Sequence, residues 1–379
     1  MNFFEQQKRS KRSSVLLASL MVVAVLCITA VVSLAVILLA HHYSPAMQPP
    51  APSQSFASIA NWLQASHVDT VALIVVGMVV VSGLFKTLEL KRGGEAVAQR
   101  LGCRLIAQDT RDLQERQALN IVEEMALACG APRPPLYLLE APGINAFAAG
   151  LSPENAIIGI TRGALEHLTR DELQGVVAHE FSHIHHGDMR FNLRLTATLH
   201  GIMVISLAGG ALLQTMHTVS RPFASNRTDN DQSPPPREER KQSAGDKLGA
   251  FVFLLGLALL ILGAIGSFFG KCIKAAVSRE REYLADAAAV QFTRNPDGIA
   301  GALKKIGGLT EGSTVNGQHV GEFGHLFFGS CLGAKGDGWL ATHPPLVERI
   351  RRIEPGWDGV FVEVGARGGE PMEGEGVEG

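Results

Sequence analysis

The chain has 379 residues, of which 46% are hydrophobic and 18% are charged, whereas soluble domains carry about 25% charged residues. Its 34 basic and 36 acidic side chains give a formal net charge of −2. This balance excludes a nucleic-acid-binding protein and a disordered polar chain. The length suggests about two domains, and the excess of apolar residues raises the question of where they gather.

Apolar residues gather in four runs, which predict a multi-pass α-helical membrane protein. The runs cover residues 15–40, 70–85, 195–213 and 249–269. The first run is longer than the apolar stretch of about 7–15 residues in a secretory signal peptide. The second and third runs are shorter or interrupted, so a buried core helix is the alternative there.

Basic residues around these runs predict the orientation of the chain in a membrane. Residues 1–14 form a basic N-terminus, whereas residues 41–69 contain no Lys or Arg. Lys86 follows the second run. By the positive-inside rule, residues 41–69 are an outer loop, and the chain returns to the cytoplasm after the second run.

The first long polar segment covers residues 86–194. Thr169 and Glu172 form a capping box, which predicts the start of a helix whose apolar residues recur at helical spacing. Ahead of it we expect a helix at 111–128 and short strands at 104–107, 136–139, 145–148 and 156–161.

The capped helix contains an H-E-x-x-H motif, His179-Glu180-Phe181-Ser182-His183. Positions i and i+4 lie one turn apart on the same helix face, so the two imidazoles can bind one Zn²⁺. Glu180 is displaced by about 100° around the helix axis and can act as general base on the water that zinc activates.

A catalytic zinc site needs a third protein ligand and an open position. The metzincin pattern fails here, because Gly187 is one position late and the third histidine is missing. Glu282 and Asp286, again at i and i+4, offer carboxylates on a later helix. One can bind the metal while the other supports a ligating histidine, and the spacing does not decide between them.

Four motifs together resemble the membrane-embedded gluzincins, the zinc metalloprotease family that includes HtpX and the CAAX prenyl proteases. The motifs are NAFAAG at 145–150, the HEFSH helix, SREREYLAD at 278–286 and THPPLVER at 342–349. The resemblance covers about residues 68–353 and is closer to HtpX-like proteases. It implies a mainly α (α+β) zincin-type protease domain that carries a small β-sheet.

The resemblance also implies residue roles, with one zinc ion per chain. It makes Glu282 the third zinc ligand and Asp286 its supporting partner. Asn145 is expected on the edge strand that pairs with substrate, and His343 and Arg349 are expected to stabilise the oxyanion. The structural alternatives are a turn residue for Asn145, a helix-entry residue for His343 and a solvated helix face for Arg349.

The domain organisation follows from the metal ligands, which must lie on the same side of the membrane. Two complete crossings or one shallow membrane hairpin, formed by the runs at 195–213 and 249–269, satisfy this condition equally well. The other expected parts are a flexible loop at 214–248, a protease domain formed by 86–194 and 270–364, and a disordered tail at 365–379.

The sequence therefore predicts a zinc-dependent endopeptidase of the bacterial inner membrane, with its protease domain in the cytoplasm. By family analogy, its partners are the lipid bilayer and misfolded or damaged membrane proteins in a stress response. The alternatives are a site-two-type intramembrane protease, a CAAX-type prenyl protease and a catalytically silent membrane scaffold. The NPDG sequence at 295–298 resembles the second motif of the site-two type, but it lies among charged residues rather than in an apolar run.

Overall fold

The computed structural model describes residues 12, 15, 19–20, 22–35, 37, 68–90, 93–224, 244–317, 320–331 and 341–363. The predictions for residues 41–67, for 225–243 and for the tail from 365 lie outside these ranges. The bounds of the loop predicted at 214–248 are wrong, because residues 214–224 and 244–248 are helical. The described chain forms two compact units. The first contains Gly93–Met189 and the described residues from Arg281 to 363, and the second contains the described residues from 12 to Leu90 and those of Arg190–Glu280.

The first unit is built around a four-stranded mixed sheet, which confirms the small sheet of the predicted fold class. The strand order is β1 (Arg104–Leu105), β2 (Leu136–Leu139), β4 (Ile157–Thr161) and β3 (Ala146–Ala149). Strands β2 and β4 are parallel, and the other two pairs are antiparallel. Strand β3 is therefore an edge strand.

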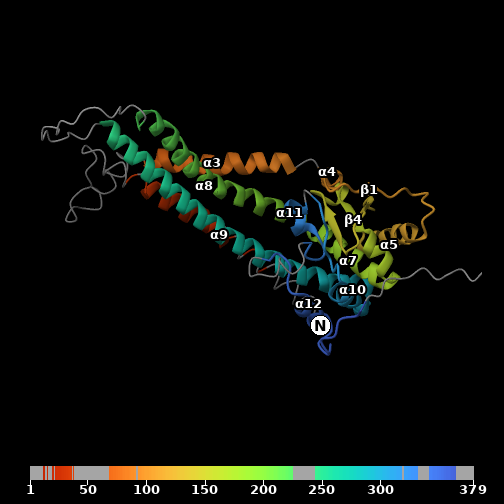
Figure 1. Ribbon diagram of the computed structural model, residues 1–379. Coiled ribbons are helices and arrows are strands. Elements are labelled where there is room, and N and C mark those ends of the chain that lie inside the picture. The colour runs from red at the N-terminus through yellow and green to blue at the C-terminus, as the bar shows by residue number, and fades with distance from the viewer. Residues whose placement is uncertain are drawn as a thin grey trace, which may run out of the picture. The chain divides into compact units, whose positions relative to one another are not determined.

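Helices make up most of the first unit, and α7 lies at its centre. It packs against α5 and α10, and it also contacts β3 (Figure 1). The buried core includes Ile158, Val176, Phe181 and Leu303. The helical elements are α4 (Gly93–Arg100), α5 (Leu113–Cys129), η2 (Pro153–Asn155), α6 (Arg162–His167), α7 (Arg170–His186), α10 (Pro296–Gly308), α11 (Val320–Phe323), η3 (Gly324–Leu326) and α12 (Leu346–Ile353).

The ends of α7 follow from its sequence. The Thr169 side chain accepts a hydrogen bond from the Glu172 amide, and the Glu172 carboxylate accepts one from the Thr169 amide, which confirms the capping box. At the other end, Gly187 adopts a left-handed conformation with φ 68° and donates its amide to carbonyl groups of the last turn. Both ends of the helix that carries the H-E-x-x-H motif are thus satisfied locally.

The second unit consists of helical chain rich in apolar residues. It contains α3 (Val68–Leu90) and most of α8 (Asp188–Ala224) and α9 (Ala244–Thr293). Among the described residues, two helices are long and apolar enough to cross a membrane, at Asp188–Thr215 and Gly249–Thr293. The apolar helices at Val22–Ala35 and Ala72–Phe85 are shorter.

Small residues allow α8 and α9 to approach each other closely within the second unit. A Cβ atom on Gly209 would lie 2.4 Å from the Leu260 amide nitrogen, and one on Gly263 would lie 2.4 Å from the Ser206 amide nitrogen. The Ser206 hydroxyl donates a hydrogen bond to the Leu260 carbonyl at 3.1 Å. This packing, with small residues and an interhelical hydrogen bond, is typical of helices that associate in lipid.

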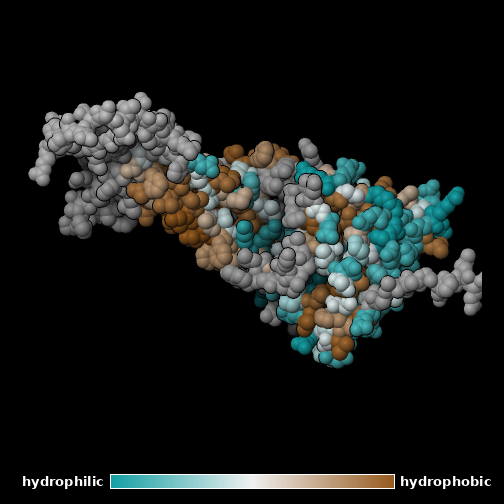
Figure 2. Space-filling view, viewed as in Figure 1, coloured by the Kyte–Doolittle hydropathy of each residue, from teal (hydrophilic) through white to brown (hydrophobic). Residues whose placement is uncertain are grey.

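Hydrophobic residues are prominent on the coloured surface of this unit in Figure 2. Large side chains such as Leu207, Ile261 and Phe269 are each about half exposed, at 58%, 49% and 57%. Water-soluble monomers rarely expose large contiguous apolar patches. The surface of the second unit therefore suits a lipid environment.

A buried carboxylate in the first turn of α5 joins several elements of the first unit. Glu115 accepts hydrogen bonds from the Thr110 hydroxyl at 2.7 Å, from Arg104 and from Arg162 at 3.4 Å. The hydrogen bond from Arg104 is the largest cause of a lowered Glu115 pKa. Because its pKa is lowered by folding, the carboxylate stabilises the fold above its unfolded-state pKa, and this contribution is lost as the pH falls.

We expect Glu115→Gln to lower the free energy of unfolding at pH 7 by about 1.5–3 kcal/mol, because the hydrogen bonds to a charged acceptor are lost. The difference from the unmodified chain should shrink as the pH falls below about 4.3, where the unfolded carboxyl is protonated. Urea unfolding at several pH values measures this. Glu123→Gln is the control, since Glu123 is 57% exposed. If Glu115→Gln lowered the free energy of unfolding by the same amount at pH 7 and at pH 3, the prediction would be wrong.

Candidate metal centre

Helix α7 brings the two histidines of the H-E-x-x-H motif together. The Nε2 atoms of His179 and His183 are 3.1 Å apart, and the two rings lie edge to face with centroids 4.8 Å apart. His179 is fully buried, whereas the His183 side chain is 15% exposed. The core residues of α7, including Phe181, fix this helix against the sheet side of the unit.

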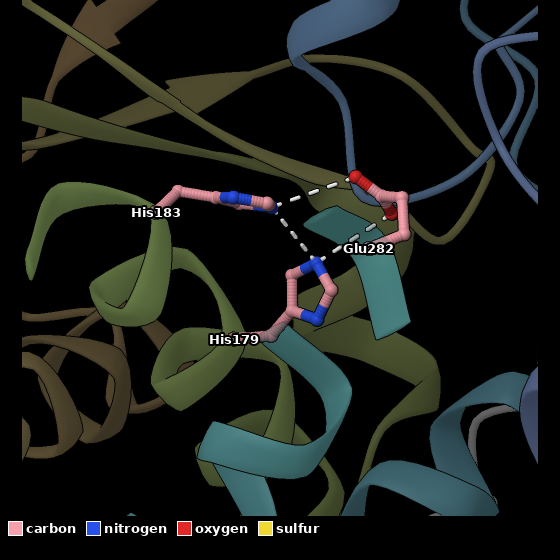
Figure 3. A group of neighbouring side chains, drawn as sticks. All are labelled: His179, His183 and Glu282. Atoms are coloured by element: carbon pink, nitrogen blue, oxygen red, sulfur yellow. Dashed lines mark hydrogen bonds and ion pairs between the residues drawn. The ribbon is translucent and has the colours of Figure 1, made fainter. Parts of the chain in front are cut away.

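Glu282, near the C-terminal end of α9, completes a group of three potential metal ligands (Figure 3). Its Oε2 is 3.7 Å from His179 Nε2, and its Oε1 is 3.6 Å from His183 Nε2. One donor atom from each residue lies within 4.8 Å of the others. The structure thus brings Glu282, rather than Asp286, to the two Nε2 atoms, and the predicted helix at 278–286 is the end of the long helix α9.

Asp286 lies behind His179, on the other side of the imidazole. Its Oδ1 is 2.9 Å from His179 Nδ1. Its carboxylate also accepts two hydrogen bonds from Arg349, from Nε at 2.9 Å and from Nη2 at 2.7 Å. The two carboxylates at i and i+4 therefore have different positions, one at the centre of the group and one at its back.

Arg349 of α12 is fully buried, so the alternative of a solvated helix face is wrong. In addition to its two hydrogen bonds to Asp286, it donates Nη1 to the Phe328 carbonyl at 2.7 Å. The same Nη1 lies 3.6 Å from Glu282 Oε2. The guanidinium group thus compensates the charge of both carboxylates from α9, while the predicted contact with an oxyanion stays a prediction.

His343 lies at the edge of the same group. Its Nδ1 is 3.3 Å from Glu282 Oε2, and its Nε2 is 3.4 Å from the Gly324 carbonyl. Its side chain is 8% exposed. The structure therefore places His343 next to the three potential ligands, and its predicted contact with an oxyanion stays a prediction.

Glu180 is fully buried beside the ligands, and burial raises the pKa of its carboxyl to about 8. The negative charge of Glu282 acts in the same direction. Neither carboxylate oxygen has a hydrogen-bond partner of standard geometry among the described residues. Burial also lowers the pKa of His179 to about 4, so this imidazole is neutral, as a metal ligand must be.

Asn145 is expected on the edge strand, but it directly precedes β3, which begins at Ala146. Its side chain, however, is held by its own chain: Nδ2 donates to the carbonyls of Ser313 and Gly329, at 2.7 and 3.1 Å. Oδ1 accepts from the amides of Ala146 and Gly329, at 3.0 and 3.1 Å. These contacts give Asn145 a structural role, and its contact with substrate stays a prediction.

The edge of β3 has a short pairing with a later segment of the first unit. Phe147 and Phe327 form an antiparallel bridge, and the Phe328 amide donates to the Ala146 carbonyl at 2.8 Å. The Phe328 ring also packs edge to face on His179, with centroids 4.8 Å apart. The segment around Phe328 thus connects the edge strand to the metal-binding group.

Sequence reasoning missed two residues at the back of His183. Oδ2 of Asp188 lies 2.8 Å from His183 Nδ1, and its Oδ1 accepts a hydrogen bond from Arg281. The available signal was an aspartate directly after Gly187, the residue that ends the H-E-x-x-H helix. Arg281 lies within the SREREYLAD motif at 278–286, directly before Glu282.

Other candidates lie outside the group. His186 interacts with Ser182, and the His185 ring packs near Phe292, so both histidines lie on other faces of α7. Asn295 caps α10 by accepting a hydrogen bond from the Asp297 amide at 3.2 Å. The NPDG sequence is thus the start of a helix, and it has no part in the metal-binding group.

An H-E-x-x-H helix joined by a glutamate from a later helix defines a metalloprotease site of the gluzincin type. Residues 112–355 match the family model described as peptidase family M48, and the chain belongs to this family. The matched segment includes every residue of the three-ligand group.

Curated relatives agree with this assignment, and each bears the name "Protease HtpX homolog". The protein of Caldanaerobacter subterraneus subsp. tengcongensis is 37% identical over 235 residues, which are 62% of this chain and 70% of the relative. The protein of Listeria innocua serovar 6a is 37% identical over 238 residues, 62% of this chain and 72% of the relative. The protein of Dictyoglomus turgidum is 34% identical over 236 residues, which are 62% of this chain and 67% of the relative. The predicted HtpX-like resemblance is confirmed, and the chain is a membrane-associated metalloprotease.

We expect Arg349→Met to lower the free energy of unfolding by about 3–5 kcal/mol, because it leaves the charge of Asp286 buried without a partner. Adding Asp286→Asn should recover part of this loss, since the uncompensated charge is then removed. Arg351→Met is the matched control, because Arg351 is exposed on the same helix, and it should change stability by at most about 0.5 kcal/mol. Urea unfolding in detergent measures the three variants. A loss below about 1 kcal/mol for Arg349→Met contradicts the prediction.

Proposed function

We propose that the chain is a membrane-bound zinc endopeptidase in which His179, His183 and Glu282 bind one zinc ion. The observation that carries the proposal is the group itself, with one donor atom from each residue within 4.8 Å of the others. Two imidazoles and one carboxylate form the ligand set of many catalytic zinc sites. The buried Oε2 of Glu282 has no hydrogen-bond partner among the described residues, which suits an atom that binds a metal.

Zinc bound there supplies a Lewis acid that polarises the scissile carbonyl and lowers the pKa of water. Glu180 accepts a proton from the water that attacks the carbonyl and then donates it to the leaving amine. Asp286, whose Oδ1 lies 2.9 Å from His179 Nδ1, would hold the tautomer of His179 whose Nε2 lone pair is available to the metal. His343 and Arg349 would supply N–H groups for the oxyanion that forms during attack.

We expect Glu180→Gln to lower the rate of casein cleavage by at least about 10²-fold, because the general base is removed. Its zinc content should stay near one ion per chain, since Glu180 is not among the three ligands. The assay compares purified chain in detergent with and without a chelator, and metal analysis gives the zinc content. Glu166→Gln is the control, because Glu166 is exposed on α6. Full activity of Glu180→Gln would exclude the assigned role.

The physiological part of the proposal is quality control of misfolded or damaged membrane proteins in a bacterial inner membrane. Its support is the name HtpX homolog borne by bacterial relatives and the apolar outer surface of the second unit. We propose four spans, at 15–40, 70–85, 195–213 and 249–269, with the protease unit in the cytoplasm. The distribution of basic residues supports this orientation.

The orientation predicts the behaviour of alkaline phosphatase fusions in bacterial cells. This reporter needs disulfides, which form outside the cytoplasm. A fusion after Ser55, in the predicted outer loop, should be active, and a fusion after Glu140, in the protease unit, should be inactive. Cytoplasmic reporter fusions at the same two points serve as the control. Phosphatase activity at Glu140 with none at Ser55 would reverse the orientation.

A further inference from the structure

We propose that Asp188 and Arg281 are a positioning pair for the metal ligand His183, equivalent to the pair formed by Asp286 and Arg349 behind His179. The inference rests on the proposed zinc site and extends it by two residues to which the motifs give no role. Asp188 lies outside the H-E-x-x-H motif, and Arg281 directly precedes Glu282.

The contacts of Asp188 divide between its two oxygens. Oδ2 lies 2.8 Å from His183 Nδ1, and Oδ1 accepts the hydrogen bond from Nη1 of Arg281. The side chains of Asp188 and Arg281 are 4% and 16% exposed. A carboxylate this deeply buried needs a compensating cation, and Arg281 supplies it.

The turn between α7 and α8 brings Asp188 to the histidine. Gly187 ends α7 in the left-handed conformation, with φ 68° and its amide bonded to the carbonyls of His183 and Ile184. A Cβ atom at Gly187 would meet no neighbour within 4 Å, so the backbone conformation, and not a lack of space, favours glycine. Asp188 is the first residue of α8 and so lies beside the last turn of α7.

The hydrogen bond has a direct consequence for metal binding. When Nδ1 of His183 donates its proton to Asp188, the imidazole is held as the tautomer whose Nε2 lone pair is available to a metal. The same bond fixes the rotation of the ring, which matters more for His183 than for the fully buried His179. Arg281 also ties Asp188 to the segment that carries Glu282, so the pair joins two ligand-bearing parts of the chain.

The two pairs differ in burial, which makes the second one easier to test. Asp286 receives two hydrogen bonds from the fully buried Arg349, and a change there endangers the fold. Arg281 is partly exposed and interacts with Asp188 near the more open side of the group, where His183 is 15% exposed. Loss of the Asp188–Arg281 pair should therefore weaken metal binding more than it weakens folding.

The test measures zinc affinity of the metal-stripped full chain in detergent, against a competing chelator. Asp188→Ala should raise the zinc dissociation constant by about 10–100-fold, as for other partners of ligating histidines. Asp188→Asn keeps an oxygen acceptor for His183, so it should raise the zinc dissociation constant by only about 10-fold. Asp171→Ala is the matched control, since Asp171 is 64% exposed in the first turn of α7, and it should leave the affinity unchanged.

Two further measurements separate positioning from a structural role. The visible spectrum of the Co²⁺-loaded chain should change in Asp188→Ala and not in Asp171→Ala, because the ligand geometry is altered. Arg281→Gln should also weaken zinc binding, but the double variant Asp188→Ala/Arg281→Gln should bind zinc no more weakly than Asp188→Ala alone. Arg281 acts through Asp188, so their effects should not add.

The outcomes distinguish this inference from the proposed function. If the unmodified chain fails to bind one zinc ion, the proposed function is wrong. If the unmodified chain binds zinc and both Asp188 variants bind it equally tightly, the positioning pair is wrong. Independent, multiplying effects of the Asp188 and Arg281 substitutions would also overturn it. Should Asp188→Ala fail to fold, the nearly isosteric Asp188→Asn decides by the same affinity measurement.

Discussion

Compensation of buried negative charge is the constraint on which the metal centre depends. Four carboxylates are buried within it, whereas two guanidinium groups face them. Isolated buried carboxylates are costly, so each needs a cation or a change of protonation. Arg281 pairs with Asp188, and Arg349 pairs with Asp286 and lies 3.6 Å from Glu282. The same constraint explains the raised pKa of Glu180, about 8, because burial disfavours the charged form of its carboxyl. The four buried carboxylates are those of Glu180, Asp188, Glu282 and Asp286, and the two guanidinium groups are those of Arg281 and Arg349.

The parts of this centre that lie within one helix could be predicted from the sequence. Helical periodicity and the Thr169 cap place His179 and His183 on one face, and the structure confirms both. The choice between Glu282 and Asp286 could not be made from spacing, because it depends on how the side of α9 faces α7. The burial of Arg349 and the internal hydrogen bonds of Asn145 were also out of reach. Both features depend on contacts with residues more than 20 positions away in the chain. The residue types alone suggested a solvated helix face for Arg349 and a turn for Asn145.

The apolar runs show a similar limit. Composition locates them, and the long helices α8 and α9 confirm the third and fourth runs as helical. The second run is different: it lies in helix α3, which extends from Val68 to Leu90, but the apolar stretch of that helix covers only Ala72–Phe85. At 1.5 Å per residue it is about 21 Å long, less than the ~30 Å of a bilayer core. Whether such a helix crosses a membrane depends on its flanking residues and on its packing against other helices, which the run itself does not contain.

The central claim is that one zinc ion is bound by His179, His183 and Glu282. Anomalous X-ray diffraction at the zinc edge, from crystals of the zinc-loaded full chain, tests it most directly. We predict a single anomalous peak about 2.0–2.1 Å from Nε2 of both histidines and about 2.0–2.2 Å from a Glu282 carboxylate oxygen. A peak at other residues, or no peak at this position in crystals with one zinc ion per chain, would contradict the claim.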